Sequence, residues 1–458
     1  MAGLSCGIAL AEAGWRVRLY EKRPHLGGRA ASYTLPDGTE IDNCQHVTLG
    51  CCTNLDDFYG RVGAREKIRF FDYLAFADAS GRISRMRAAA LPAPLHLALA
   101  FVRLGGLRAG EKWAIARALN EILRSGGRPS DARGITMLEW LERRRQPAGA
   151  IANFWRLVLV SALDEELDRA EAQYGIDVFW KSFLVNRAGF RMGVPAAPLG
   201  ELYEGCRKAL ERRGGEIRTR ARVARFRIEQ ERVGALAFED GNEEIADAYV
   251  AAVPHGALLE MLPAELVERE PVFGNLRRLQ ASPITGVHLW YDRTVTEEPF
   301  LALMGLESQW IFNKTALLNP APAPPNESAK QYLQVVISAS YDLVSESRQE
   351  IIERARKEME LVLPAAREAQ VVKATVVKET AATFSPAPGV DQWRPESQSP
   401  IGQLFLAGDW TRTGWPATME SAVRSGYLAA QAVLNLAGQH RTFLQPDLPA
   451  EGFVHLWS

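Results

Sequence analysis

The feature that most constrains the fold is a small-residue helix followed by a short strand and an acidic residue at the start of the chain. MAGLSCGIALAEAGWRVRLYE predicts a helix that stops at Gly14 and an alternating strand that ends at Glu21. In a dinucleotide-binding unit the third glycine of GxGxxG packs the first helix on the sheet, and an acidic residue about 20 positions later binds the ribose. Glu21 stands eighteen positions after Gly3, so both residues fit that register.

The sequence as given begins inside this motif. The first strand and the first two glycines would precede Met1, so we expect a Rossmann-type α/β domain whose first strand is missing. A helix and a strand of this kind also occur in α/β proteins that bind no nucleotide. The assignment therefore depends on further motifs.

Two such motifs lie far apart in the chain. Gly27-Gly28-Arg29 follows Glu21 closely, and it offers open backbone for a ligand together with a forked cation for a diphosphate. Near the other end, an apolar strand stops at Gly408-Asp409, where a carboxylate can accept bonds from a polyol. A helix then begins at Thr418-Met419, and its free N–H groups can stabilise negative charge on a flavin ring.

Composition narrows the partners and the compartment. The chain has 458 residues and a net charge of −1, so no nucleic-acid partner is expected. Its 5 cysteines are odd in number and include no CxxC pair, which argues against disulfides and a metal site and favours a cytoplasmic protein. The apolar stretch 91–107 is too short and too interrupted to span a bilayer. It could lie at a membrane surface, wall a cavity or form a buried helix.

Together these segments resemble the FAD-dependent amine oxidase and phytoene desaturase superfamily. Within it the chain resembles the hydroxysqualene dehydroxylase family most, through IDNCQHVTLG (41–50), KETAATFSPAPGVDQWRP (378–395) and LFLAGDWTRTGWPATMESAVRSGYLAA (404–430). The resemblance implies a FAD site that the following residues contact: Gly3, Glu21, Lys22, Gly27, Gly28, Arg29, Val223, Gly408, Asp409, Thr418 and Met419. Among these, Val223 matches the place where the superfamily holds the adenine through backbone atoms.

The resemblance also implies a two-domain organisation. Residues 1–86, 200–255 and 396–438 are expected to form a discontinuous FAD-binding domain. Residues 87–199 and 256–395 would form a substrate domain of mixed sheet with a helical lobe, and 439–458 a C-terminal tail. The aromatic residues Phe101, Trp155, Phe179 and Trp180 of the lobe could line a polyisoprenoid tunnel or form plain core.

The activity implied is reductive removal of the hydroxyl group of hydroxysqualene to give squalene, with His46 as the proton donor and Gln45 orienting the hydroxyl. His46 could instead pack against the flavin without transferring protons. The substrate would be a polyisoprenoid, the electron donor is left open, and the protein could lie on the inner face of a membrane. Alternatives are a carotenoid desaturase or an amine oxidase of the same superfamily, and a non-catalytic membrane-associated scaffold.

Overall fold

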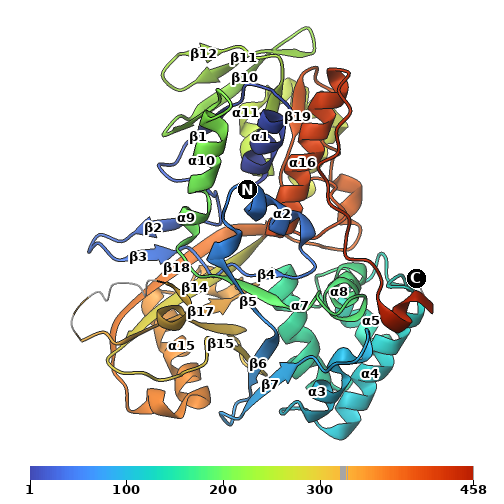
Figure 1. Ribbon diagram of the computed structural model, residues 1–458, viewed down its shortest axis with the longest axis vertical. Helices are drawn as coiled ribbons and strands as arrows, with labels where there is room; N and C mark the ends of the chain where they lie inside the picture. Colours follow the sequence, from blue (N-terminus) through green and yellow to red (C-terminus); the bar gives the residue numbers. More distant parts are fainter. Residues whose placement is uncertain (320–325, 327, 457–458) are drawn as a thin grey trace.

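The computed structural model describes residues 1–319, 326 and 328–456. The Pro- and Asn-rich segment 319–328, whose composition predicts a loop, falls mostly outside these residues. Figure 1 shows the parallel strands together with helices α1 and α16 at one end of the molecule. A large sheet lies at the other end, with a helical lobe beside it.

The parallel strands form two separate pairs. β1 (Arg18–Glu21) pairs with β9 (Glu216–Thr219), and β13 (Tyr249–Ala251) pairs with β19 (Leu404–Leu406). Glu21 lies opposite Thr219 at the end of the first pair. As the sequence predicted, β1 ends at Glu21, the acidic residue of the first motif. β19 ends at Leu406, and only Ala407 separates it from the Gly-Asp of the last motif.

Helices α1 (Ala2–Glu12) and α16 (Met419–Leu436) pack closely on each other beside these strands (Figure 1). A Cβ atom placed on Gly426 of α16 would come within 2.3 Å of the carbonyl oxygen of Ala2. Any side chain at this position would therefore push the helices apart. The hydroxyl of Ser5 also donates to the carbonyl of Val423 at 3.3 Å across the contact. The small residues at both ends of the chain thus bring its first and last motifs together.

A seven-stranded mixed sheet forms the second part of the molecule. Its strand order is β18-β14-β17-β16-β15-β6-β7, and neighbouring strands are antiparallel except β15 and β6. The strands, in that order, are Val371–Phe384, Ala281–Tyr291, Gln331–Ile337, Trp310–Asn313, Phe300–Leu303, Tyr73–Ala77 and Ile83–Arg87. Helix α15 (Arg348–Val362) packs on β14 and β18, and a capping box of Ser347 and Glu350 begins it.

The helical lobe confirms the predicted helical character of the region before residue 200. Its helices are α3 (Ala98–Arg103), α4 (Ala109–Arg124), α5 (Met137–Arg143), α6 (Ala148–Ala150), α7 (Arg156–Leu163) and α8 (Ala172–Phe179), with π-helical turns at Ile151–Trp155 and Trp180–Leu184. Trp155 and Phe179 are buried against each other, with ring centroids 4.8 Å apart. The lobe and the large sheet share one hydrophobic core.

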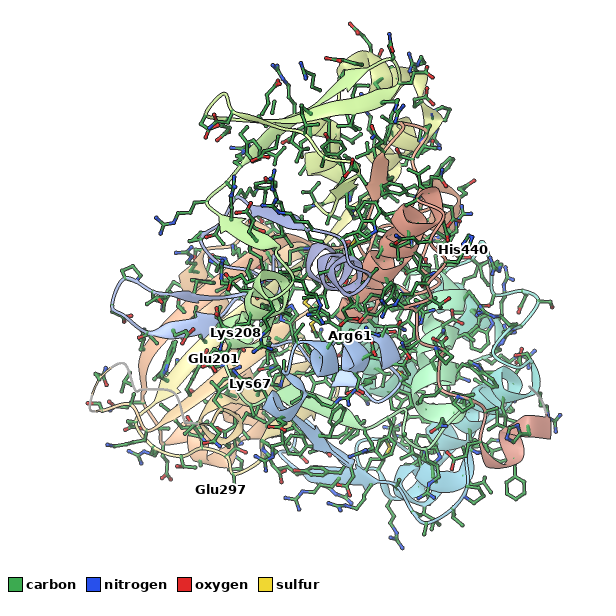
Figure 2. The ribbon with its side chains drawn as sticks, turned by 45° about the horizontal axis from the view of Figure 1, so that its top comes forward. Arg61, Lys67, Glu201, Lys208, Glu297 and His440 are labelled. Atoms are coloured by element: carbon green, nitrogen blue, oxygen red, sulfur yellow. The ribbon has the colours of Figure 1, made fainter. Side chains whose placement is uncertain are left out.

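Shorter elements complete the fold. The strands are β2 (Ser32–Thr34), β3 (Glu40–Asp42), β4 (Thr48–Leu49), β5 (Ile68–Phe71), β8 (Met192–Pro195), β10 (Val223–Glu229), β11 (Arg232–Phe238) and β12 (Glu243–Glu244). The helices are α2 (Thr53–Arg61), α9 (Leu199–Leu202), α10 (Glu204–Glu211), α11 (His255–Met261), α12 (Ala264–Arg269), α13 (Pro271–Gly274) and α14 (Lys314–Leu317). Figure 2 shows Lys67 and Glu201, which form an exposed ion pair of 2.9 Å between the segment before β5 and α9.

The predicted division into domains stays a proposal. The pairing of strands in the large sheet is relevant to the first predicted boundary, between residues 86 and 87. β6 and all of β7 except its last residue, Arg87, fall within the predicted segment 1–86, yet both strands belong to the large sheet. Pairing alone would therefore place residues 73–87 with the substrate part. The pattern of residues in this stretch carries no information about which sheet its strands join.

Candidate active site

A cavity of about 1080 Å³ lies where the two parts of the molecule meet. It is lined by α1, β1 and the segment after β19, and by the ends of β17 and β18 in the large sheet. All thirteen residues predicted for the site line it, namely Gly3, Glu21, Lys22, Gly27, Gly28, Arg29, Gln45, His46, Val223, Gly408, Asp409, Thr418 and Met419. The structure therefore brings the predicted residues together, while the role of each remains a prediction.

The end of the cavity at α1 suits a nucleotide. A Cβ on Gly3 would come within 3.1 Å of the Cβ of Ala252, so only a small residue lets α1 approach the strand pair of β13. Glu21 ends β1 and accepts a hydrogen bond from the backbone N–H of Arg23 at 2.7 Å. Val223 begins β10 and also faces the cavity. An acidic acceptor and an open strand edge thus lie together where a ribose and an adenine would bind.

The Gly-Gly-Arg loop lines the cavity and contacts the last motif through Arg29. Gly28 has φ +66°, and a Cβ atom there would meet nothing within 4 Å. The guanidinium of Arg29 donates to the carbonyl oxygen of Ala382 at 2.7 Å and to the carboxylate of Asp409 at 2.6 Å. A cation and open glycine backbone are the groups that a diphosphate requires.

The neighbouring residues Gly408 and Trp410 fix the backbone around Asp409. The N–H of Gly408 donates to the hydroxyl of Ser425 at 2.8 Å, and the indole of Trp410 donates to the carbonyl of Val253 at 2.9 Å. A Cβ on Gly408 would lie 2.3 Å from the indole nitrogen of Trp410. Glycine is therefore required for the indole of Trp410 to lie against the backbone at position 408.

The first turn of α16 faces the cavity with Thr418 and Met419. Thr418 caps the helix, because its hydroxyl oxygen accepts the N–H of Ser421 at 3.1 Å. The first N–H groups of a helix lack intrahelical acceptors, and this end carries partial positive charge. The turn therefore suits an electron-rich ring such as the flavin pyrimidine.

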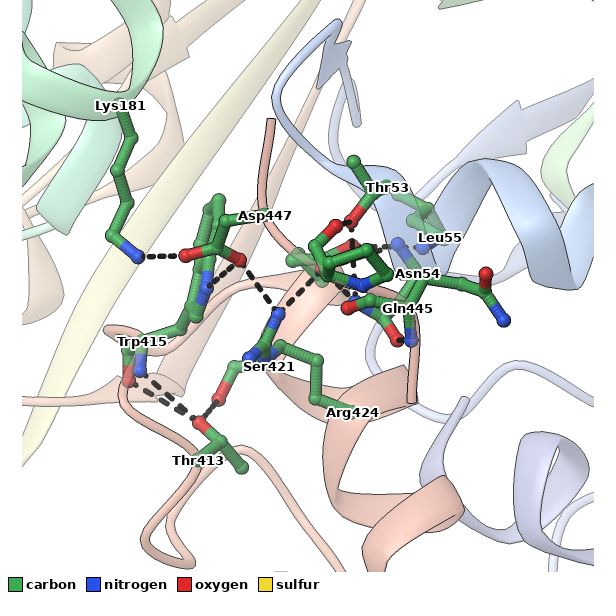
Figure 3. Close-up of polar contacts among 12 residues, drawn as sticks. Thr53, Asn54, Leu55, Lys181, Thr413, Trp415, Ser421, Arg424, Gln445 and Asp447 are labelled. Atoms are coloured by element: carbon green, nitrogen blue, oxygen red, sulfur yellow. Dashed lines mark hydrogen bonds and ion pairs between the residues drawn. The ribbon is translucent and has the colours of Figure 1, made fainter. Parts of the chain in front are cut away.

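A polar network fixes this turn from the outside (Figure 3). The buried carboxylate of Glu420 accepts backbone N–H bonds from Asn54 at 3.2 Å and Leu55 at 2.7 Å, at the start of α2. Burial raises the pKa of Glu420. Asp447 accepts from Arg424 at 2.9 Å and also binds Lys181, so the C-terminal segment ties α16 to the helical lobe.

Gln45 and His46 are held by a buried ion pair that the sequence analysis missed. The ammonium of Lys314 donates to Asp42 and to the side-chain oxygen of Gln45, each at 2.8 Å. The side chains of Lys314 and Asp42 are only 1% and 3% exposed. Although burial acts to raise it, the ammonium keeps the pKa of Asp42 below its ordinary value. A lysine inside the apolar stretch QWIFNKTALL was the signal available in the sequence.

The hydrogen bonding of His46 defines its proton state. Its Nδ1 lies 3.0 Å from the carbonyl oxygen of Cys44. A carbonyl only accepts, so Nδ1 carries the proton and Nε2 keeps a lone pair. Burial lowers the pKa of His46. The neutral ring is therefore prepared to accept a proton, whereas donation would require protonation first.

The aromatic residues of the region divide between cavity and core. Trp410 and Trp415 line the cavity. Phe101, Trp155 and Phe179 pack in the aromatic core of the lobe, and none of them is among the described residues that line the cavity. Of the two alternatives for the lobe aromatics, the structure supports plain core.

Three further observations describe what the site and its surroundings contain. All five cysteines are free thiols. Within residues 1–319, 326 and 328–456, no group of three or more His, Cys, Asp or Glu side chains is arranged to hold a metal ion. Over the same residues, no helix is both long and apolar enough to cross a membrane.

Comparison with known proteins identifies the family to which the chain is similar. The family model for flavin containing amine oxidoreductase matches residues 1–434. Zeta-carotene desaturase of Synechocystis sp. is 28% identical over 95% of each chain. The 15-cis-phytoene desaturase of Solanum lycopersicum is 27% identical over 95% of this chain and 76% of its own length.

Solved structures show the same fold. An oxidoreductase from Methanosarcina mazei superimposes with a TM-score of 0.73 at 16% identity, over 95% of this chain and 98% of its own. Putrescine oxidase with bound putrescine superimposes with a TM-score of 0.69 at 14% identity, over 96% of this chain and 97% of its own. With a matching family model and a cavity that fits FAD, the chain belongs to the flavin containing amine oxidoreductase family and is a FAD-dependent oxidoreductase.

Proposed function

We propose that this enzyme carries out redox chemistry on a long polyisoprenoid chain, and that desaturation of a carotenoid-type substrate is its first candidate reaction. The observation that carries the proposal is the alignment of two carotenoid desaturases over 95% of the chain. Beyond the cofactor residues, the cavity wall is apolar at Val47, Ile284 and Val336, which suits a hydrocarbon.

Bound FAD supplies the two-electron chemistry, because it can accept a hydride or, when reduced, donate one. The protein supplies the rest. The apolar wall excludes water from the reacting carbons. Desaturation also requires a base, since the substrate loses a proton along with the hydride. Neutral His46, held by Cys44 and next to Gln45, has a free lone pair that can take this proton.

Reductive dehydroxylation of hydroxysqualene is the second candidate. A specific observation favours it: the three stretches that resemble hydroxysqualene dehydroxylases, 41–50, 378–395 and 404–430, all contribute residues to the wall of the same cavity. In this reaction the hydroxyl leaves as water and a hydride replaces it. The protein must then donate a proton to the substrate.

Product analysis separates the candidates. FAD-loaded protein would be incubated with phytoene or zeta-carotene under oxidising conditions, and with hydroxysqualene after anaerobic reduction of the flavin. A product with one more double bond supports desaturation, and squalene supports dehydroxylation. Turnover of putrescine or another amine, with no polyisoprenoid product, would refute both and favour an amine oxidase.

We also propose that the helical lobe contacts a membrane surface from which such a substrate could enter. Leu99 is 52% exposed, Val102 66% and Trp113 73%, all on helices α3 and α4. Arg103 and Lys112 lie beside these apolar side chains in the sequence. An apolar patch with flanking cations is typical of proteins that lie on anionic lipid.

A further inference from the structure

Asp164 is a buried acidic residue in the cavity wall to which no role has been assigned. It directly follows α7 of the helical lobe, in the left-handed conformation with φ +52°. Its side chain is 4% exposed, and it lines the cavity together with Ser161 and Thr383. Aspartate tolerates this backbone conformation, so the residue could serve only to end the helix. Its hydrogen bonds indicate a role beyond ending the helix.

The carboxyl group of Asp164 reaches across to two strands of the large sheet. One oxygen accepts the backbone N–H of Ala339 at 2.8 Å, just after β17, and the other lies 2.9 Å from the hydroxyl of Thr383 at the end of β18. Ala339 is itself left-handed, with φ +51°. For alanine this conformation is strained, and strain of this kind gathers at functional sites.

These contacts place Asp164 close to the cofactor site. Thr383 directly follows Ala382, whose carbonyl oxygen binds Arg29 at 2.7 Å, and Arg29 is paired with Asp409. Cys44 lines the same cavity as Asp164 and directly precedes Gln45 and His46 in the chain. The carboxyl group therefore lies in the wall of the cavity that the Arg29–Asp409 pair and the segment of Gln45 and His46 also line.

The surroundings favour the protonated form of Asp164. Burial raises its pKa well above the ordinary value, and the neighbouring carboxylate of Glu165 acts in the same direction, while the bonds from Ala339 and Thr383 oppose it. Cys44 contributes no charge near neutral pH, because burial raises its pKa to about 12. Glu165 accepts a hydrogen bond from the hydroxyl of Tyr341 at 2.7 Å and pairs with Arg169 at 3.1 Å.

We propose that Asp164 is the catalytic acid that protonates the leaving hydroxyl group of an allylic polyisoprenoid alcohol. This inference rests on dehydroxylation, the second candidate function. The C–O bond breaks, and the oxygen leaves as water with the proton of Asp164. The carbon receives a hydride from reduced FAD, and the Asp164 carboxylate regains a proton from solvent. His46 is neutral, and its Nδ1–H donates a hydrogen bond to the carbonyl oxygen of Cys44, so its Nε2 can accept a proton but has none to donate.

The substitution Asp164→Asn separates this role from a structural one. Asparagine also tolerates the left-handed backbone, accepts the N–H of Ala339 and can donate to the hydroxyl of Thr383, but it has no acidic proton. Glu165→Gln is the matched control, because Glu165 is equally buried and adjacent but is not among the described cavity-lining residues.

The experiment measures squalene formation from hydroxysqualene with anaerobically reduced, FAD-loaded protein, as a function of pH. The wild-type rate should fall as pH rises through the raised pKa of Asp164, because the carboxylate cannot donate. We expect Asp164→Asn to lose at least about 100-fold in rate and to lack this dependence. At low pH Glu165→Gln should remain within a few-fold of wild type, and its rate should begin to fall at lower pH because the charge of Glu165 no longer raises the pKa of Asp164.

Thermal unfolding provides a second readout that does not depend on activity. A raised pKa in the folded state means that Asp164 contributes stability at low pH that is lost as pH rises through this pKa. The Asn variant has no such group and should not lose this stability. Its melting temperature should therefore rise relative to that of the wild type as the pH increases, with flavin bound to both proteins. A constant difference with pH would contradict a protonated Asp164.

The possible outcomes distinguish failure of the role of Asp164 from failure of the dehydroxylation reaction itself. If the wild type makes squalene and Asp164→Asn does so at the same rate, Asp164 is not the acid and dehydroxylation stands. If the wild type makes no squalene although it binds and reduces FAD, dehydroxylation fails and the assignment of Asp164 fails with it. A folded, flavin-bound and inactive Asp164→Asn variant alongside an active Glu165→Gln variant supports the assignment.

Discussion

Arg29 and Asp409 form an ion pair of 2.6 Å across 380 residues of sequence. The pair joins the Gly-Gly-Arg loop at the start of the chain to the Gly-Asp motif near its end. Asp409 is 6% exposed, whereas the side chain of Arg29 is 32% exposed, so solvent reaches the pair from the side of the arginine. It marks the point where both halves of the cofactor site meet.

Replacing Arg29 by alanine should weaken FAD binding. Loss of a charge-assisted contact costs about 1.5–3 kcal/mol, which corresponds to a roughly 10- to 100-fold rise in Kd. Titration of the apoprotein with FAD, followed by flavin fluorescence, measures this. Arg412→Ala is the control, since Arg412 is an exposed arginine paired with Glu396. Equal affinities for the Arg29 variant and the wild type would show that Arg29 does not hold the cofactor.

Some residues of this site could be predicted from the sequence because they belong to a motif, and others could not. Gly3, Glu21 and Asp409 belong to motifs in which a ligand dictates the spacing, so their positions could be predicted. Asp164 and Lys314 leave no such signal, because the partner of each comes from a distant segment that only the folded chain brings near. The sheet that a strand joins also leaves no local signal, so the sequence could not show that β6 and β7 pair within the large sheet.

His46→Gln should slow desaturation by about 100-fold, because glutamine cannot accept the proton. Since burial lowers the pKa of His46, the wild-type rate should stay level across pH 6.5, the ordinary histidine value, and fall only at more acidic pH. Steady-state rates over a pH series test this. His440→Gln, at an exposed histidine, should behave as wild type (Figure 2). A drop centred on pH 6.5 would contradict a buried, neutral His46.

Lys314→Met should destabilise the fold by about 3–5 kcal/mol, because it leaves the buried charge of Asp42 without its partner. Adding Asp42→Asn should restore part of the loss, since the amide oxygen can still accept from Ser32 and from the N–H of Leu199. Urea unfolding of the single and double variants measures the difference.

The exposed pair of Lys67 and Glu201 is the control for this cycle. Lys67→Met should cost less than about 1 kcal/mol, as is usual for surface ion pairs. Similar losses for Lys314→Met and Lys67→Met would show that burial of the Asp42 pair carries no special cost.

The double substitution Leu99→Asp and Val102→Asp should reduce binding to vesicles of mixed neutral and anionic phospholipid, because it places charge on the apolar face of α3. Co-sedimentation with the vesicles measures binding. Leu436→Asp replaces another exposed leucine, 61% exposed at the end of α16, and should leave binding unchanged. Equal binding by all three proteins would place the membrane contact elsewhere or exclude it.

The most direct test of a FAD site that acts on polyisoprenoids is the flavin spectrum after anaerobic mixing with substrate. Oxidised, FAD-loaded protein should lose its flavin absorbance with phytoene or zeta-carotene, or reduced protein should regain it with hydroxysqualene, and Asp409→Ala should show neither change. If no polyisoprenoid alters the spectrum in either direction, while an amine such as putrescine bleaches it, the proposed substrate class is wrong.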